Sequence, residues 1–344
     1  MCLLALPALA DTLRPDTIRI ATYNADLSRA GPGLMLQALR RGDDPQAAAV
    51  VAVIAALKAD VLLLTGIDYD LRGDTLAALA DRVAAAGLSY PYRLALRPNT
   101  GVATGLDLDG NGRKGEPRDA MAYGRFAGEG GMAVLSRLPL DVTALRDFTG
   151  FLWADLPGNL RPPDTPAGQL LSTSGQYEVP LRLPDGRSLR LLTYYATPPV
   201  FDGPEDRNGR RNHDETGFWL RLLAGELSIP PPARPFVLLG QPNLDPADGE
   251  GLRDAIRDLL ALAALQDPAP RGSNPRADPV QSGDPALDTA LYANLGGLRV
   301  EQILPSADLT VTASGVLWPP DTDPLAAVLA AASRHRPLWV DLQL

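Results

Sequence analysis

Amide and carboxylate side chains follow the apolar run 235–239, which predicts a buried strand. Gln241, Asn243 and Asp245 come directly after this run, so we expect the strand to present them at its C-terminal end. A carboxylate at such a strand end can activate a water molecule as a general base. Gln241 instead carries an amide, which cannot take up a proton near neutral pH. The segment therefore predicts a polar strand end at which Gln241 offers an amide and no general base.

Two further predicted strands also end in polar or small residues. The run 17–23 alternates and is rich in β-forming residues, which predicts a half-buried strand that ends at Asn24, with Asp26 two residues further on. The run 61–64 predicts a short buried strand, and Gly66 and Asp68 follow it.

The rest of the chain alternates predicted strands and helices. Asp44 and Pro45 predict the cap and first turn of a helix that ends near Leu57. Further helices are expected at 75–86, about 214–224 and 252–262, and further strands at 131–137, 178–183, 188–194, 298–304 and 338–342. This mixture predicts two β sheets packed face to face under outer helices, although periodicity alone leaves another α/β arrangement open.

The composition is that of a folded protein rather than a disordered or fibrous one. Hydrophobic residues make up 45% of the 344 positions and charged residues 21%. We find no linker-like stretch, so we expect a single domain over residues 11–344. The formal net charge of -9 disfavours general binding to nucleic-acid backbones.

The first residues are typical of an export signal. The apolar segment 1–10 ends in Ala8, Leu9 and Ala10, a pattern like an Ala-x-Ala cleavage site, although no basic segment precedes it and a short buried strand is the alternative. No later apolar run is long enough to span a bilayer. We therefore expect a periplasmic or secreted protein, which would lose Cys2, its one cysteine, with the signal.

Taken together, these motifs resemble the endonuclease/exonuclease/phosphatase superfamily. The segment 240–246 is similar to its Gly-Asp-Phe-Asn-x-Asp-Pro signature, and the resemblance extends from Ile18 to Leu344. The long polar string 197–215 is similar to that of a secreted bacterial branch. The resemblance implies a four-layer α/β/β/α sandwich with the site at one edge of the strands, and metal-dependent phosphoesterase chemistry.

Several site residues of the family have counterparts here. The resemblance implies a metal-proximal role for Asn24 and Asp26, and transition-state hydrogen bonding by Asn243. It also implies that Glu301 orients the imidazole of His335. Tyr195 stands where the family usually has a catalytic histidine, and the resemblance implies the arrangement of the branch that cleaves abasic sites, which has a tyrosine there. The remnant catalytic set is therefore His335, Asn243, Tyr195 and Glu301.

Three positions depart from the family pattern. Gly66 replaces the metal-binding glutamate, Gln241 replaces the aspartate base, and Arg334 replaces the aspartate beside the histidine. Magnesium needs hard oxygen ligands, usually with at least one or two protein carboxylates, so we expect no metal cofactor. We hypothesise a degenerate, catalytically impaired member that binds a phosphorylated small molecule or an unknown protein partner.

Two alternatives remain open at this point. One is an active phosphoesterase, for phosphomonoesters or phosphodiesters and nuclease-like, whose Mg²⁺ or Mn²⁺ is held by Asp26, Asp68 or Asp245 in a rearranged site. The other is a purely structural protein that binds a partner through its long loops.

A second cluster of cations lies at 207–213. Arg210 and Arg211 are candidates, with Arg334, for binding a phosphate, and His213 follows them. The competing interpretation is a surface loop with salt bridges to neighbouring acids. Because His213 and His335 are the two histidines of the chain, a histidine-rich zinc centre is not expected.

One loop resembles half of a calcium-binding loop. Asp107, Asp109 and Asn111 supply oxygen at positions 1, 3 and 5, and Gly112 stands at position 6. Position 12 is Arg118 rather than glutamate, and Asp119 comes one residue late. The alternatives are a calcium site and a structural turn.

Overall fold

The computed structural model describes residues 16–276 and 278–343. The expected export signal at 1–10, including Cys2, lies outside these residues. Among the described residues, no helix has both the length and the apolar character needed to cross a membrane.

The first sheet contains the strands that carry Asn24 and Gly66. Its order is β12-β13-β1-β2-β4-β3, and β1 and β2 are parallel neighbours. The strands are β1 (Thr17–Leu27), β2 (Val61–Ile67), β3 (Tyr92–Ala95), β4 (Gly131–Ser136), β12 (Val311–Val316) and β13 (Leu338–Gln343).

The second sheet contains the strand that carries Gln241. Its order is β11-β8-β7-β6-β5, and β7 and β8 are parallel neighbours. The strands are β5 (Arg146–Asp147), β6 (Gln176–Arg182), β7 (Ser188–Tyr195), β8 (Phe236–Gln241) and β11 (Gln302–Pro305). A separate pair is formed by β9 (Ala290–Tyr292) and β10 (Gly296–Leu298).

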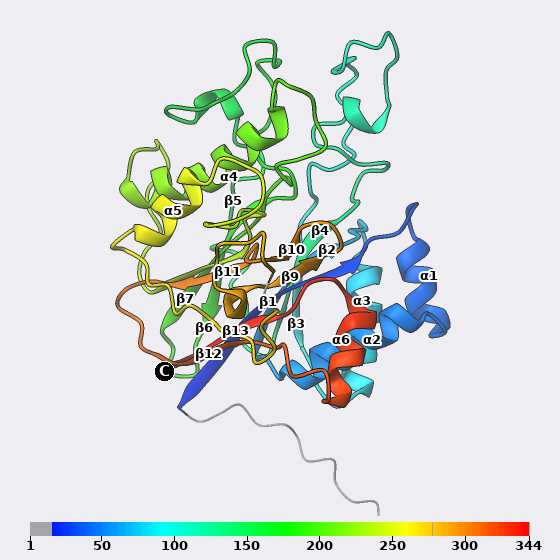
Figure 1. The fold of residues 1–344 in the computed structure, drawn as a ribbon, viewed down its shortest axis with the longest axis vertical. Coiled ribbons are helices and arrows are strands. Elements are labelled where there is room, and N and C mark those ends of the chain that lie inside the picture. Colours follow the sequence, from blue (N-terminus) through cyan, green and yellow to red (C-terminus); the bar gives the residue numbers. More distant parts are fainter. Residues whose placement is uncertain (1–15, 277, 344) are drawn as a thin grey trace, which may run out of the picture.

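In the described part of the chain, six α-helices cover the outer faces of the two sheets (Figure 1). On the first sheet lie α1 (Leu34–Arg41), α2 (Pro45–Leu57), α3 (Asp74–Ala85) and α6 (Pro324–Ala332). On the second lie α4 (Arg207–Ala224) and α5 (Asp254–Ala261). The order helix, sheet, sheet, helix confirms the predicted four-layer α/β/β/α sandwich.

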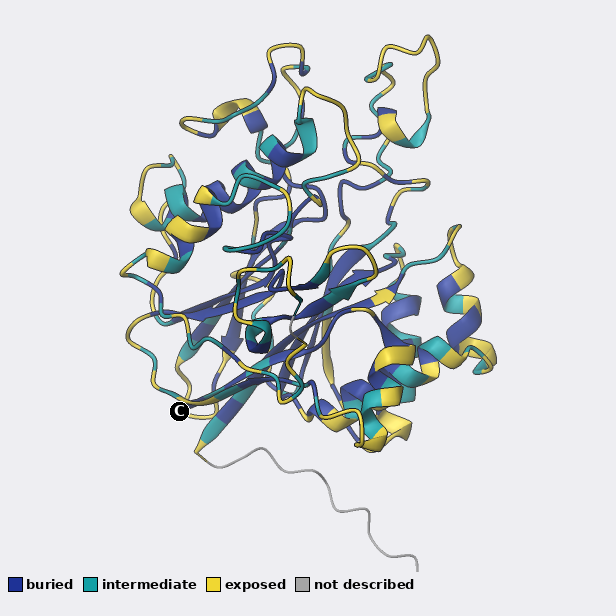
Figure 2. Cartoon of the chain, in the orientation of Figure 1, coloured by how far each residue is buried: buried dark blue, intermediate teal, exposed yellow. Residues whose placement is uncertain are grey.

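The alternation of side chains along a strand explains the layers. In β2, Leu62 and Leu64 pack among the helices, whereas Val61 and Leu63 pack against the second sheet. Because apolar residues occupy both faces, the whole strand is buried (Figure 2).

Two helices, α2 and α6, begin with an aspartate cap followed by proline. Asp44 accepts a hydrogen bond from the backbone N–H of Ala47 at 2.9 Å, and Pro45 opens α2. Asp323 caps α6 in the same way, through the N–H of Leu325 at 2.8 Å.

Two predicted elements differ from the structure. The helix expected from about Asp214 begins at Arg207, because its polar first turns are stabilised by buried contacts rather than by an apolar face. The strand expected over 298–304 is interrupted: β10 ends at Leu298, and β11 starts at Gln302 after the chain has crossed to β8.

The parallel pairs β1/β2 and β7/β8 face each other across the interior, so their C-terminal ends meet at one edge of the sandwich. Long connections at 96–130 and 148–175 rise above this edge (Figure 1). The candidate site lies beneath them.

Candidate functional site

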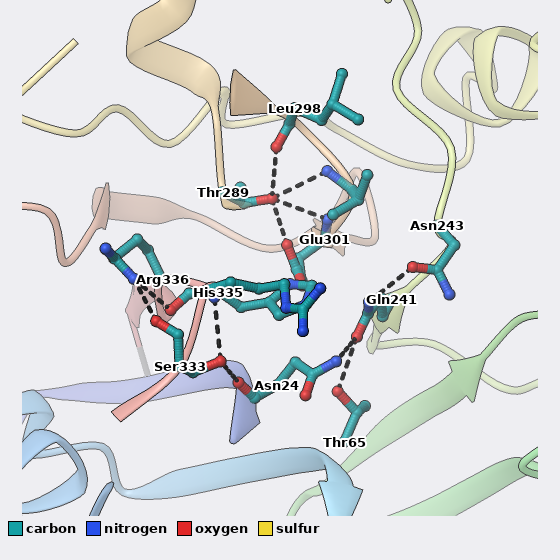
Figure 3. A network of polar contacts seen from close by, with 12 residues as sticks. Asn24, Thr65, Gln241, Asn243, Thr289, Leu298, Glu301, Ser333, His335 and Arg336 are labelled. Atoms are coloured by element: carbon teal, nitrogen blue, oxygen red, sulfur yellow. Dashed lines mark hydrogen bonds and ion pairs between the residues drawn. The ribbon is translucent and has the colours of Figure 1, made fainter. Parts of the chain in front are cut away.

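A chain of hydrogen-bonded amides joins the two sheets at this edge (Figure 3). Asn24 Nδ2 donates to Gln241 Oε1 at 2.7 Å, and Thr65 Oγ1 donates to the same oxygen at 3.1 Å. Gln241 Nε2 donates to Asn243 Oδ1 at 2.7 Å, and Asn243 Nδ2 donates to the carbonyl of Ala196 at 2.7 Å. Both heteroatoms of Gln241 are therefore occupied, and its side chain is buried at 2% exposure.

The backbone at Gly66 also differs from what a metal-binding side chain needs. Gly66 has a φ of +68°, in the left-handed region that favours glycine. A Cβ added there would lie 2.4 Å from Asn24 Oδ1, which in turn accepts a hydrogen bond from the N–H of Asp26 at 3.0 Å. The carbonyl end of Asn24 thus fills the space in which a glutamate side chain would begin.

Asp26 and Arg334 form a pair at the surface of the site. Arg334 Nε lies 3.7 Å from Asp26 Oδ2, and about half of each side chain is exposed. Arg334 and Asp26 therefore face each other where solvent can reach both.

His335 and Glu301 are buried together, as the resemblance implies. His335 Nδ1 lies 2.5 Å from Glu301 Oε1, although the two groups are not aligned as a hydrogen bond. The second oxygen of Glu301 accepts a short hydrogen bond from the hydroxyl of Thr289. Tyr292 packs edge-on against the imidazole, with ring centroids 6.0 Å apart.

The segment before the histidine is tied to β1. Ser333 Oγ donates to the carbonyl of Asn24 at 2.9 Å and accepts from the backbone N–H of His335 at 3.1 Å. The structure therefore brings Asn24, Gln241, Asn243 and His335 to one edge from three separate parts of the chain.

Tyr195 ends β7 beside this network. Burial raises the pKa of its phenol to about 12, and the nearby charge of Asp26 acts in the same direction. A hydrogen bond with Asn24 opposes this rise in the pKa. Tyr195 is therefore a neutral hydrogen-bonding group at physiological pH.

The acids considered for a rearranged metal site are already engaged. Asp68 accepts hydrogen bonds from Ser28 Oγ at 2.7 Å and from the N–H groups of Arg29 and Gly130 at 3.0 and 3.1 Å. Burial raises the pKa of Asp68 above its ordinary value.

Asp245 is engaged in the same way by backbone donors. It accepts from the N–H groups of Ala247, Asp248 and Arg299 at 2.7, 2.8 and 2.6 Å. These bonds hold the turn after β8 and the crossing at Arg299.

The donor set at this edge does not fit a magnesium ion. Of the carboxylates there, Asp26 faces a cation, Glu301 contacts His335, and Asp68 and Asp245 are occupied. Octahedral magnesium requires oxygen ligands at about 2.0–2.1 Å and is repelled by a neighbouring arginine.

The arginine cluster lies on α4 rather than on a surface loop. Arg211 is buried, and its guanidinium donates to the carbonyls of Leu170, Leu171 and Ser172 at 2.9, 2.9 and 3.3 Å. Arg210 donates to the carbonyls of Glu205 and Leu160, at 3.1 and 3.4 Å. Both guanidinium groups hold loops, so for Arg211 this placement corrects the expectation of a phosphate-binding side chain.

His213 is also part of α4 and contacts carboxylates. Its Nδ1 lies 2.8 Å from Asp214 Oδ1, and its Nε2 lies 3.5 Å from Asp254 Oδ2. Although burial opposes it, the pKa of His213 is raised by these carboxylates, above all by its hydrogen bond to Asp214.

The same helix supplies buried polar residues whose individual roles could not be deduced from the sequence. Glu215 accepts from the N–H groups of Thr173 and Thr197, both at 2.6 Å. Asn212 donates to the carbonyls of Thr197 and Pro242, at 2.6 and 2.7 Å. The only signal in the sequence is the length of the polar string 197–215. Its function in the fold is to fasten the loops that surround the candidate site.

Burial is the main cause of the pKa shifts of two further groups on this helix, Glu215 and Arg211. It raises the pKa of Glu215 to about 7, against the opposing charge of Arg211. It also lowers the pKa of Arg211 below its ordinary value.

The calcium-like loop brings three carboxylates together. Oxygen atoms of Asp107, Asp109 and Asp119 lie within 4.8 Å of one another. Asp119 is placed by the short turn 117–119, and its oxygens accept from the N–H groups of Leu108 and Glu116 at 2.8 and 3.0 Å. Asn111 Oδ1 instead accepts from the N–H of Arg113 at 2.8 Å. The calcium hypothesis stays a prediction.

The fold and this edge together define the class of the protein. A family model for the Endonuclease/Exonuclease/phosphatase family matches residues 21–335, so the chain belongs to this family. The members of this family are phosphoesterase-like and nuclease-like proteins. No curated protein matches the chain.

Solved structures share the fold. An endonuclease/exonuclease/phosphatase from Beutenbergia cavernae DSM 12333 has a TM-score of 0.58 and 18% identity, over 96% of this chain and 72% of that chain. A family protein from Leptotrichia buccalis C-1013-b has a TM-score of 0.54 and 14% identity, over 94% and 98%. Sphingomyelinase C from Streptomyces griseocarneus has a TM-score of 0.51 and 16% identity, over 94% and 99%.

Proposed function

We propose that this protein is a non-hydrolysing member of its family that has been kept for binding. The observation that carries the proposal is the state of Gln241. Its carbonyl oxygen accepts from Asn24 and Thr65, and its amide nitrogen donates to Asn243. A side chain with this chemistry cannot activate water, and removal of a general base lowers rates by about 100- to 10,000-fold.

The positions of the other two replacements support the same proposal. At Gly66, a glutamate would need both a left-handed backbone and the space now filled by Asn24. Arg334 adds a positive charge to the site. At about 4 Å and an effective dielectric of 20, it would repel each positive charge of a metal ion by about 4 kcal/mol. Loss of the metal removes several kcal/mol more of transition-state stabilisation.

The ligand in this proposal is a phosphorylated small molecule. Arg334 is a cation at the site edge that solvent can reach, with 56% of its side chain exposed. Among the described residues, its guanidinium makes one ion pair, a contact of 3.7 Å to Asp26. Guanidinium groups bind phosphate through paired hydrogen bonds, so a phosphate could displace this contact. Binding through Arg334 needs no metal.

We also propose export to the periplasm or the medium, on the pattern of Ala8, Leu9 and Ala10. Fractionation of cells that express the full chain tests this. Retention of uncleaved protein in the cytoplasm would contradict it.

Purified protein should be assayed with Mg²⁺ and Mn²⁺ against phosphomonoesters, phosphodiesters and DNA, with the His335→Ala variant beside it. We expect no metal-dependent turnover above that of His335→Ala. Turnover by the parent chain that His335→Ala abolishes would establish the alternative, an active phosphoesterase.

A binding assay separates the ligand from the chemistry. Inorganic phosphate and a sugar phosphate should bind the parent chain without metal, and Arg334→Ala should bind them about tenfold or more weakly. Equal binding by Arg334→Ala would remove Arg334 from the proposal. Absence of both turnover and binding would leave partner binding through the loops as the function.

A further inference from the structure

A cavity of about 210 Å³ lies beside α6, away from the amide chain. Its walls come from α6, from the segment 318–321, from Arg276 and from Arg336. Asn24, Gln241 and Asn243 do not line it. The volume corresponds to about seven water molecules at about 30 Å³ each, enough for a small organic molecule.

Arg336 is a buried cation in the wall of this cavity. Its residue exposure is 6%, and its Nη1 donates to the carbonyls of Ser333 and His335 at 2.7 and 3.1 Å. Within residues 16–276 and 278–343, its Nε has no hydrogen-bond acceptor. A buried guanidinium that lacks a carboxylate partner is costly, which points to an acceptor that the protein does not itself supply.

The surroundings of Arg336 increase this demand for an anion. Burial lowers its pKa, and the nearby charge of Arg276 lowers it further. Arg276 Nη2 is paired with Asp321 Oδ1 at 2.8 Å. The residues that line the cavity thus include two arginines and one carboxylate. The cavity therefore has a net positive charge.

The remaining walls are apolar and flat. The ring of Trp318 lies under the Arg336 guanidinium, with Cζ 4.9 Å from the ring centroid. The α6 side contributes small or branched aliphatic residues, namely Ala326, Ala327, Leu329 and Ala330. Small side chains on this face leave room for the body of a ligand whose charged end meets Arg336.

We propose that this cavity binds a small organic anion, a carboxylate or a phosphate ester on a compact apolar body, with Arg336 as its anchor. Arg276 supplies the second guanidinium, which Asp321 holds in the cavity wall. The proposal is independent of the chemistry at Gln241, because the two sites share no side chain.

Calorimetric titration of the full chain carrying Arg334→Ala, which removes the phosphate site proposed above, tests the proposal with four probes: benzoate, phenyl phosphate, acetate and inorganic phosphate. We expect saturable binding of benzoate or phenyl phosphate, and a preference between them identifies the anionic group. Acetate and inorganic phosphate should bind at least about tenfold more weakly, because they leave the apolar wall uncovered.

Two variants assign binding to the cavity. Ala330→Leu fills it from an exposed position on α6, and Arg276→Gln removes the second cation; each should weaken binding about tenfold or more. Ala331→Leu is the matched control, since Ala331 is an exposed neighbour that does not line the cavity, and it should bind as the parent does.

Three results would overturn the proposal. The first is no saturable binding of benzoate or phenyl phosphate at tens of millimolar. The second is binding that Ala330→Leu and Arg276→Gln leave unchanged. The third is that phenyl phosphate binds no more tightly than inorganic phosphate and benzoate no more tightly than acetate. This would show that an apolar body on the ligand contributes nothing to binding.

Discussion

The direction of the hydrogen bonds around Gln241 makes the Gln241→Glu variant a sharp test of the amide chain. A glutamate has nearly the same shape, and one of its oxygens can still accept from Asn24 and Thr65. Its second oxygen would face Asn243 Oδ1, an acceptor. Rotation of the Asn243 amide does not help, because its Oδ1 would then face the carbonyl of Ala196.

Protonation of the new carboxyl group resolves this conflict. A protonated glutamate can donate to Asn243 Oδ1 and so restores the whole chain of bonds. Folding therefore raises the pKa of the new group above its unfolded value. Stability relative to the parent is then close to normal below about pH 4.3 and is lost as the pH rises through the folded pKa.

At pH 8, the free energy of unfolding of Gln241→Glu should be about 3–5 kcal/mol lower than that of the parent, which is the usual cost of an uncompensated buried charge. With an unfolding entropy of about 2.1 cal/mol/K per residue, this corresponds to about 4–7 °C in Tm for a chain of this length. Differential scanning calorimetry of both proteins from pH 4 to pH 8 measures it. Gln37→Glu, at an exposed position on α1, is the control and should shift Tm little at any pH.

A Gln241→Glu protein that matches the parent at pH 8 would refute the reasoning about the amide chain. A rise in the Tm of the parent with millimolar Mn²⁺ that Asn24→Ala and Asp26→Ala abolish would refute the wider argument, since it would place a divalent ion beside these residues.

Three further predictions use other features. Gly66→Ala should destabilise the fold by about 2–4 kcal/mol, against about 1 kcal/mol for Gly73→Ala, because both have a left-handed φ but only Gly66 has a close neighbour; equal losses in urea unfolding would contradict the contact. Since the pKa of Glu215 is raised to about 7, the free energy of unfolding of the parent should fall by about 3 kcal/mol relative to that of Glu215→Gln as the pH rises from about 4.5 to 7. Unfolding free energies of the two proteins that change in parallel with pH would contradict this. Calcium titration should release heat that Asp107→Asn abolishes; no heat at millimolar calcium rejects the site.

Much of the fold could be predicted because its signals are local. The alternation along β1, the apolar run of β2 and the cap formed by Asp44 can each be recognised in a short stretch of sequence. The start of α6 carries the same signal, since Asp323 and Pro324 repeat the pattern of Asp44 and Pro45, but it was missed because the helix is alanine-rich on all sides. The start of α4 had no such signal, because polar contacts with distant loops stabilise its first turns.

The candidate site could be predicted only as a set of residue types. The resemblance placed Asn24, Gln241 and His335 together, but the pairing of their atoms depends on how two sheets face each other. The bond between Asn24 and Gln241 joins residues 217 positions apart, and no spacing rule fixes its direction. The buried environment of Arg211 likewise depends on carbonyls from a loop that the sequence gives no means of placing.

On the proposal that the metal site has been lost, the backbone at Gly66 and the amide chain make that loss hard to reverse by single substitutions. Replacement of Gly66 by glutamate would introduce a left-handed non-glycine residue and displace Asn24 Oδ1 from its bond to the N–H of Asp26. A moved Asn24 would in turn release Gln241 Oε1, which Asn24 and Thr65 now satisfy. On this proposal, a metal site would require changes at Gly66 and Gln241, a rearranged turn after β2 and removal of the Arg334 charge. A change at Gly66 or at Gln241 made alone breaks a bond of the amide chain before it gains a metal ligand, so the amide chain is a stable arrangement at this edge.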